Sequence, residues 1–194
     1  MQGHSGDLAA IEVDETKTTR EVTHGELRAM VGRIQRSLTR LGVEPGDRVA
    51  GILPNTVDAL AYTLATLSIG AVWTSCAPEF GARGVLDRFG QVSPAVLVVA
   101  ERYVYNEKQH SLAAKGLEAA AELPGLRHVI VLGGNPAVGQ AGTAAVHSAD
   151  VLADELTSEP SFVRLDFDTP PTSSTPRARP VCQRRSCIAP AGCC

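Results

Sequence analysis

Short, almost wholly apolar runs alternate with helix-like segments along most of this sequence, and this alternation limits the possible fold more than any other feature. The run Val129-Ile130-Val131-Leu132 is one example, and similar runs extend from Val49 to Leu53 and from Ala95 to Val99. Strands that are apolar on both faces are typical of parallel sheets covered by helices, and parallel strands need crossover connections. The sequence therefore predicts an α/β fold with a layered, mostly parallel sheet.

The boundaries of the expected elements follow from periodicity and turn residues. Thr23 and Glu26 have the spacing of a capping box, and Gly42 is placed to end the helix that follows them. The other expected elements are a hairpin of Leu8 to Val13 with Arg20 to Val22, helices from Val57 to Ile69, Val85 to Val92 and Leu112 to Leu123, and strands from Val49 to Leu53, Ala71 to Trp73, Ala95 to Val99 and His128 to Leu132. The small, polar stretch from Asn135 to Ser148 predicts a loop, and Ala149 to Leu156 predicts one short helix. The pattern does not predict the order of the strands.

Composition excludes several classes of function. The chain is 44% hydrophobic and 20% charged, as in ordinary globular proteins, and its net charge of -3 does not favour a nucleic-acid or membrane-surface partner. No apolar run is long enough to span a bilayer, and the N-terminus lacks the pattern of a signal peptide. These features predict a cytoplasmic protein in a reducing compartment, with its cysteines present as thiols.

Residues 169–194 differ in composition from residues 1–168, and they contain four of the five cysteines. They show neither helical nor strand periodicity, and their apolar surface is too small to offset an ordering cost of about 1 to 2 kcal/mol per residue, which predicts a disordered tail. A zinc site in the tail is disfavoured because Cys182, Cys187, Cys193 and Cys194 lack paired CxxC spacing and a nearby histidine. A nucleic-acid-binding tail is disfavoured because no aromatic residues lie between its arginines.

Several motifs carry a family resemblance. The turn Gly42 to Val49 (GVEPGDRV) and Leu53-Pro54-Asn55 are similar to segments shared across the adenylate-forming acyl-CoA synthetase superfamily. Narrower signals are Ser75 to Gly81 (SCAPEFG), Val85 to Phe89 (VLDRF) and Tyr105 to Lys108 (YNEK), which resemble the acetoacetyl-CoA synthetases more than acetyl- or propionyl-CoA synthetases. The resemblance extends over residues 22–168 and implies a partial N-terminal subdomain of an AMP-binding enzyme.

In that family, acetoacetate reacts with ATP to give an acyl-adenylate and pyrophosphate, and the acyl group then passes to the thiol of CoA. The resemblance thus implies ATP, Mg²⁺, CoA and acetoacetate as ligands of the intact enzyme. A family loop of the form SSGTTGLPKAIVH cradles the phosphates, shortly after a segment like Asp166-Phe167-Asp168. This chain has no such loop. We therefore expect no retained cofactor, no catalytic residue and no ligase activity from this chain alone.

A shifted reading frame accounts for the tail. If each codon takes the last base of one residue and the first two bases of the next, the stretch from Thr175 to Ile188 can be read as SSGTTGLPKAIVH. For example, Gln183 ending in A, followed by AG from Arg184, gives the lysine. We interpret residues 169–194 as a frameshifted translation that begins near Asp168.

The resemblance also implies candidate CoA-binding residues, because the corresponding segments of related synthetases lie beside the CoA nucleotide. The candidates are Phe80, Gly81, Ala82, Tyr105, Asn106 and Lys108. Lys108 could contact a phosphate and Tyr105 could pack on adenine. The alternative is an exposed loop without a ligand, and Glu107, which stands where the family usually has glycine, places a negative charge beside the proposed phosphate contact.

Other candidate sites have simpler explanations. Cys76 could be a nucleophile, but without a basic partner it is better interpreted as a small buried thiol. Gly133-Gly134-Asn135 could be a phosphate-binding turn, but a single Gly-Gly after a strand is typical of a tight connection. No metal site is predicted. A non-catalytic α/β domain that binds a nucleotide or a partner is the alternative function, and the uncovered sheet of a partial subdomain predicts self-association.

Overall fold

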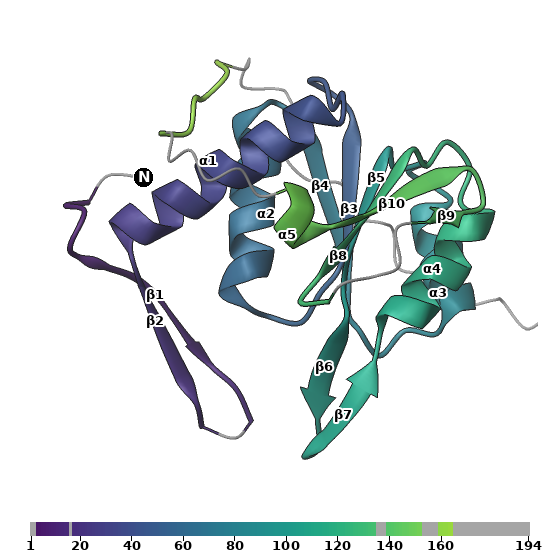
Figure 1. The fold of residues 1–194 in the computed structure, drawn as a ribbon, viewed down its shortest axis with the longest axis horizontal. Coiled ribbons are helices and arrows are strands. Elements are labelled where there is room, and N and C mark those ends of the chain that lie inside the picture. The colour runs from purple at the N-terminus through teal and green to yellow at the C-terminus, as the bar shows by residue number, and fades with distance from the viewer. Residues whose placement is uncertain (1–2, 16, 135–138, 153–158, 165–194) are drawn as a thin grey trace, which may run out of the picture.

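A mostly parallel sheet lies at the centre of the protein in the computed structural model, which describes residues 3–15, 17–134, 139–152 and 159–164 (Figure 1). The strand order is β4-β3-β5-β8-β10-β9, and every neighbouring pair is parallel except β10 with β9. The strands are β3 (Arg48–Ile52), β4 (Val72–Cys76), β5 (Val96–Ala100), β8 (His128–Leu132), β9 (Gln140–Ala141) and β10 (Ala144–Ser148). The α/β class predicted from the sequence is confirmed.

The chain reverses its direction across the sheet at β3. It passes from β3 through α2 (Val57–Ser68) to β4 on one side, and then returns through α3 (Ala82–Phe89) to β5 on the other side of β3. It continues in this second direction through α4 (Ala113–Glu122) to β8 and β10. In open α/β sheets, ligands bind at such a reversal, beyond the carboxyl ends of the strands. The topology therefore predicts a crevice beyond β3 and β5.

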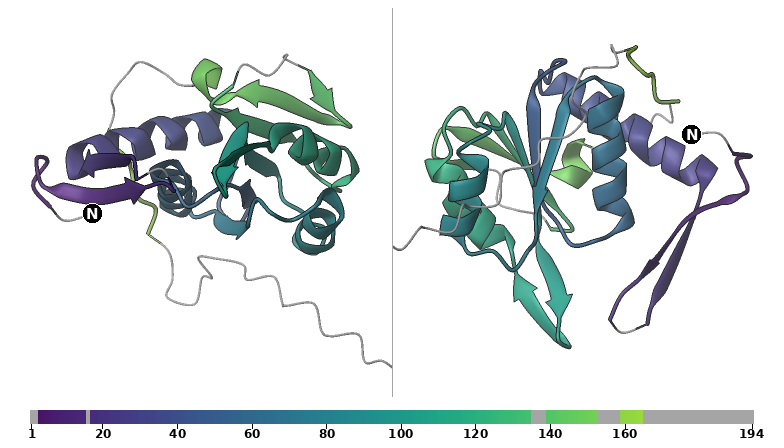
Figure 2. Two further views of the ribbon diagram at one scale, coloured as in Figure 1. Left: turned by 90° about the horizontal axis from the view of Figure 1, so that it is seen from below. Right: turned by 180° about the vertical axis from the view of Figure 1, so that it is seen from behind.

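Helices cover both faces of the sheet (Figures 1 and 2), so the uncovered strand faces expected from the sequence are not found in the described part of the chain. The helices α1 (His24–Arg40), α2 and α5 (Ala149–Leu152) lie on one face, whereas α3 and α4 lie together on the other. The central strand β5 is consequently buried, and the four side chains from Val96 to Val99 are 0% exposed. Burial on both faces explains why these strands are almost continuously apolar in sequence.

The capping box predicted before α1 is present. The Thr23 hydroxyl accepts a hydrogen bond from the Glu26 N–H, and the Glu26 carboxylate accepts one from the Thr23 N–H at 2.8 Å. These two contacts satisfy backbone donors that have no partner within the helix. At the other end, Gly42 has a φ of 71°, which favours glycine and ends the helix as predicted.

Residues 159–164 return across α1 and α2 and are held there by Gln35. The Gln35 amide oxygen accepts a hydrogen bond from the Ser161 N–H at 3.0 Å, and its amide nitrogen donates to the Ser161 carbonyl and to the Ser68 hydroxyl. The Val163 N–H donates to the Ser68 carbonyl. Gln35 is buried, so its polar groups are satisfied by the returning segment and by α2.

Two hairpins extend from the body of the molecule (Figure 1). The first consists of β1 (Leu8–Val13) and β2 (Thr19–Thr23) and was predicted from the sequence. The second, β6 (Arg102–Tyr105) and β7 (Lys108–Ser111), was not predicted. Asn106 and Glu107 form its two-residue turn with φ values of 51° and 60°, as in the type I′ turns that join twisted strands.

The predicted loop from Asn135 to Ser148 is wrong in its second half. Residues 135–138 lie outside the described part of the chain, but β9 and β10 follow them, and β10 pairs with β8. Three of the five residues of β10 are alanine or serine and only Val146 is β-branched, so the sequence lacks the β-branched density of the other strands, and the strand is stabilised by pairing with its neighbour. The predicted helix from Val85 to Val92 begins three residues earlier, at Ala82, and α5 is described only to Leu152.

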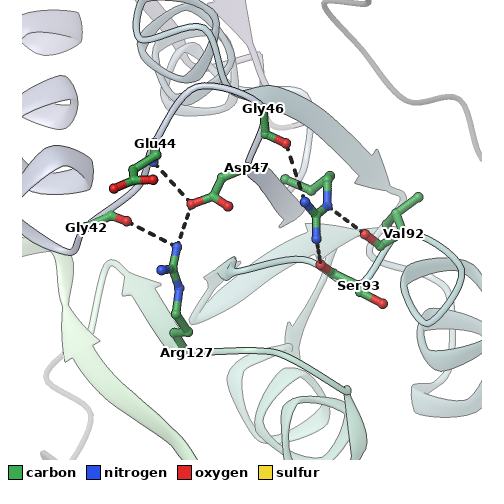
Figure 3. A network of polar contacts seen from close by, with 8 residues as sticks. Gly42, Glu44, Gly46, Asp47, Val92, Ser93 and Arg127 are labelled. Carbon is green, nitrogen blue, oxygen red and sulfur yellow. Dashed lines mark hydrogen bonds and ion pairs between the residues drawn. The ribbon is translucent and has the colours of Figure 1, made fainter.

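The turn from Gly42 to Val49, which carries the superfamily resemblance, lies at the amino end of β3. Arg127 donates hydrogen bonds to the Gly42 carbonyl at 3.2 Å and to the Asp47 carboxylate (Figure 3). The same carboxylate oxygen accepts the Glu44 N–H at 3.1 Å. These hydrogen bonds connect the turn to Arg127, which directly precedes β8.

Arg48 connects this turn to the segment that follows α3. Its guanidinium donates to the carbonyls of Val92 and Ser93 at 2.9 and 2.7 Å. The amino ends of parallel strands lie at the opposite edge of the sheet from their carboxyl ends. The contacts therefore give this superfamily motif a structural role, away from the crevice predicted by the topology.

Candidate functional site

A cleft of about 800 Å³ opens beyond the carboxyl ends of β3, β4 and β5. It lies at the reversal of strand order described above, where α/β sheets bind ligands. Four separate segments line it, namely residues 12–15 of the first hairpin, 53–56 after β3, 75–80 at the end of β4 and beyond, and 102–105 of the second hairpin, together with Arg88 of α3.

The two hairpins meet beside the cleft. The Glu107 N–H, in the turn of the second hairpin, donates a hydrogen bond to the Glu15 carboxylate of the first hairpin at 3.3 Å. Val13 and Tyr105 are 61% and 52% exposed although both line the cleft. This part of the wall therefore offers apolar surface that a ligand or another part of a protein can cover.

Phe80 and Arg88 form one side of the cleft. The Arg88 guanidinium lies 3.9 Å from the centre of the Phe80 ring, which is a cation–π contact. The contact holds an aromatic ring and a positive charge next to each other at the carboxyl end of β4.

Three aromatic side chains occupy the second hairpin. Tyr103 and His110 pair across the strands with ring centroids 5.2 Å apart, and the Tyr105 ring lies 6.5 Å from His110. Burial and the nearby Glu79 carboxylate raise the pKa of Tyr103, so its hydroxyl stays protonated at neutral pH. Tyr103 and Tyr105 both face the cleft, where a planar group could stack on them.

The charges of the cleft are mixed. Its basic residues are Arg88 and Arg102, and its acidic residues are Glu12, Asp14, Glu15 and Glu79. Arg102 forms an ion pair with Glu101 at 2.8 Å. The Glu12 carboxylate accepts the Val57 N–H at 2.8 Å and thereby caps the first turn of α2. The cleft is therefore not a uniformly cationic phosphate pocket.

The family model described as "AMP-binding enzyme" matches residues 2–179. The chain belongs to the AMP-binding enzyme family. It is 41% identical over 168 residues to the acetoacetyl-coenzyme A synthetase of Rhizobium meliloti (strain 1021), an alignment that covers 86% of this chain and 26% of that protein. It is also 44% identical over 112 residues to the acetoacetyl-CoA synthetase of Gallus gallus, covering 58% of this chain and 17% of the relative.

A solved structure agrees with these relatives. The acetoacetyl-CoA synthetase from Streptomyces lividans is 42% identical and superimposes with a TM-score of 0.75, over 84% of this chain and 24% of that one. The resemblance inferred from the sequence motifs is confirmed. The chain spans about a quarter of the length of the first of these relatives and of this solved structure.

The cleft of this AMP-binding family member contains only some of the residues predicted from the sequence. Phe80 and Tyr105 line it, whereas Gly81 precedes α3 and Ala82 lines a separate hollow between α3 and α4. Their role in binding CoA stays a prediction. The other two candidates are Asn106, in the turn, and Lys108, which begins β7 and is exposed.

Several lining residues were not predicted, among them Glu12, Asn55, Ser75, Arg88 and Arg102. They come from segments that are far apart in the sequence. For Asn55, Ser75 and Arg102 the available signal was their position shortly after predicted strands, and it could be used only once the strand order was known.

The structure favours the simpler interpretations of two other candidates. Burial raises the pKa of the Cys76 thiol to about 12, and the nearby Arg88 only partly offsets this shift, so the thiol stays protonated. Gly133 has a φ of 77° directly after β8, as in a tight connection. A Cβ added at Gly134 would lie 2.7 Å from the Glu101 carboxyl carbon, which places a negative charge where the phosphate-turn hypothesis needs an anion site.

Among the described residues, no three or more His, Cys, Asp or Glu side chains are grouped as metal ligands. The cysteines at 182, 187, 193 and 194, considered above as a zinc site, lie outside the described residues, as do the predicted disorder and frameshift of residues 169–194. Within the same described ranges, no helix is both long and apolar enough to cross a bilayer.

Proposed function

We propose that this chain is the N-terminal part of an ATP-dependent acetoacetate–CoA ligase. The observation that carries the proposal is an open cleft at the topological reversal of the sheet, in a chain that is 41% identical to an acetoacetyl-CoA synthetase over most of its length. In the complete ligase, acetoacetate and ATP would form an acyl-adenylate, and the CoA thiol would then displace AMP.

The chain contributes a wall of the CoA-binding region in this proposal. Phe80 and Tyr105 present aromatic surface to the cleft, and Lys108 lies next to the turn at the tip of the same hairpin. An adenine ring can stack on such aromatic surface, and an ammonium group can contact a phosphate. Because the cleft also contains carboxylates, the basic groups that bind most of the CoA phosphate charge would come from the rest of the ligase.

The chain is inactive by itself in this proposal. The adenylation step needs donors and a cation around the ATP phosphates, and neither a phosphate loop in the sequence nor a set of Mg²⁺ ligands among the described residues supplies them. The purified chain, incubated with acetoacetate, ATP, Mg²⁺ and CoA, should release no pyrophosphate and form no acetoacetyl-CoA. Formation of acetoacetyl-CoA above a no-protein control would refute the inactivity.

Calorimetric titration with CoA tests the contribution of the cleft. Binding, if retained, should be weakened by Tyr105→Ala and by Lys108→Ala, because these remove the stacking surface and the charge. Lys17→Ala is the matched control, since it removes an exposed lysine from the other hairpin without touching the candidate residues. Equal affinities for CoA in all variants would argue against a role of Tyr105 and Lys108 in CoA binding. Binding of a different nucleotide or of a protein, with no response to CoA, would support a non-catalytic α/β binding domain instead.

The nucleotide sequence around codon 168 tests the origin of the tail. We infer that the alternative frame encodes the loop SSGTTGLPKAIVH followed by further ligase sequence. A frame that is closed or unrelated to ligases would contradict this inference.

A further inference from the structure

Two histidines on the neighbouring strands β8 and β10 approach each other, and neither lines the cleft. His128 is the first residue of β8, and His147 lies on the neighbouring parallel strand β10, where Ala145 is the register partner of His128. Side chains two residues apart on a strand share a face, so the two imidazoles meet diagonally. Nδ1 of His128 lies 3.1 Å from Nε2 of His147, and the ring centroids are 5.2 Å apart.

We propose that His128 and His147 form a binding site for a Zn²⁺-like divalent transition-metal ion. Imidazole nitrogens bind Zn²⁺ at about 2.0–2.1 Å in tetrahedral sites, so two such ligands of one ion lie roughly 3.3 Å apart. The observed separation is close to this value. A metal ion would therefore require only a small rotation of the two rings, with no movement of the strands.

The surroundings of His128 suit a ligand. A hydrogen bond with the backbone of Leu41 acts on its ring. Because Nδ1 is directed at His147, Nε2 is the nitrogen left for this bond, and donation from Nε2 would leave the lone pair on Nδ1. Histidines that bind metals commonly donate their other ring N–H to a carbonyl in this way. Leu41 also caps the C-terminal end of α1, whose dipole favours a cation.

Arg127 directly precedes His128 in the sequence, so its charge bears on a cation bound at the pair. The Arg127 guanidinium would repel a metal ion, but it is hydrogen-bonded to the Asp47 carboxylate and the Gly42 carbonyl. Its charge is thereby partly compensated.

The site is expected to be a weak one. No third His, Cys, Asp or Glu of the described residues joins the pair, so water would complete the coordination sphere. The alternative is a simple N–H···N hydrogen bond between two neutral rings, which needs no metal ion and which Zn²⁺ would have to replace. The two arrangements differ in their response to added metal.

Calorimetric titration of the full chain with Zn²⁺ at pH 7.5 distinguishes them. Cys182, Cys187, Cys193 and Cys194 are replaced by serine in every protein used, because thiolates also bind Zn²⁺. We expect binding of one Zn²⁺ per chain that His128→Gln and His147→Gln each weaken by about tenfold or more, since losing a ligand costs at least as much as losing its supporting contact. His110→Gln, which removes a histidine of the second hairpin, should leave the affinity unchanged.

No binding to the parent, or equal binding by the parent and both glutamine variants, would overturn the proposal. Zn²⁺ should also raise the melting temperature of the parent but not of His147→Gln. If a variant does not fold, imidazole ¹⁵N spectra of the parent decide the question. Zn²⁺ should then shift Nδ1 of His128 and Nε2 of His147, and shifts confined to other histidines would refute the site.

Discussion

Replacing Gly51 by alanine should destabilise the protein and change the environment of Trp73. Gly51 lies in β3, and the indole of Trp73 on the adjacent strand β4 crosses directly over it. A Cβ added at Gly51 would lie 2.6 Å from Cζ2 and from Cη2 of the indole. Carbon atoms in contact are about 3.5–4.0 Å apart, so the ring would have to move by roughly 1 Å.

The size of the loss in the free energy of unfolding depends on the space into which the indole can move. Trp73 is 6% exposed, and a hollow of about 410 Å³ lined by Leu53 and Leu60 adjoins it. Overpacking costs about 1–3 kcal/mol, and the hollow lets the ring yield, which favours the lower part of that range. Alanine also restricts the conformations of the unfolded chain, which raises the free energy of unfolding by about 0.4–1 kcal/mol. We expect a net loss of about 1 kcal/mol in the free energy of unfolding.

Urea unfolding followed by fluorescence measures both effects, because Trp73 is the only tryptophan in the sequence. The Gly51→Ala protein should unfold at lower urea concentration, and its native emission should shift to longer wavelength as the ring moves toward solvent. Gly6→Ala is the control, since no atom lies within 4 Å of its added Cβ, and it should leave the emission unchanged. Unchanged emission together with unchanged stability in Gly51→Ala would refute the described packing.

Four further predictions concern other parts of the chain. Cys76 should react slowly with iodoacetamide at pH 8 and faster only as the pH rises toward its pKa of about 12, which peptide mass spectrometry can measure; rapid labelling at pH 8 would contradict its burial. Thr23→Ala should lower the free energy of unfolding by about 1 kcal/mol in urea titrations. The backbone N–H and the hydroxyl of Thr23 both lower the pKa of Glu26, and the variant loses only the hydroxyl, so a part of the difference should be present above pH 4.5 and disappear as the pH falls below it; a difference wholly independent of pH would show that the hydroxyl does not bind the Glu26 carboxylate. The full chain should form concentration-dependent oligomers in size-exclusion chromatography, since Leu8, Ile11 and Val13 are about half exposed or more and β4 is an edge strand, whereas a monomer at all concentrations would argue against association. Deleting residues 169–194 should leave the circular dichroism and melting temperature unchanged, and a clear loss of stability would show that the tail packs on the body.

Elements whose signal is local were predicted correctly. The helix α1 is an example, because its capping box, its apolar stripe and Gly42 all lie within the element or directly beside it. The buried strand β5 is apolar along its whole length, and β8 is apolar from Val129 to Leu132, which the sequence displays without reference to any partner. The motifs of the AMP-binding family were likewise visible as contiguous residues.

Elements that depend on pairing with another strand were not predicted from the sequence. The strand β10 consists mostly of small residues and is stabilised by the pairing of its backbone with β8, so its sequence by itself is typical of a loop. The hairpin of β6 and β7 turns at Asn106-Glu107, which lacks the glycine that usually marks such turns. In both segments, pairing and packing outweighed weak local preferences.

The sequence by itself determined the class of the fold and the family, because burial periodicity and contiguous motifs are properties of neighbouring residues. Only the tertiary structure decided the strand order, and with it the cleft. Crossover helices connect parallel strands equally well in several orders, so no local pattern shows that β3 lies between β4 and β5. The cleft residues come from four separate segments, and the meeting of His128 with His147 depends on the register of β8 and β10. Such sites arise from distances between strands, which are set when the sheet assembles.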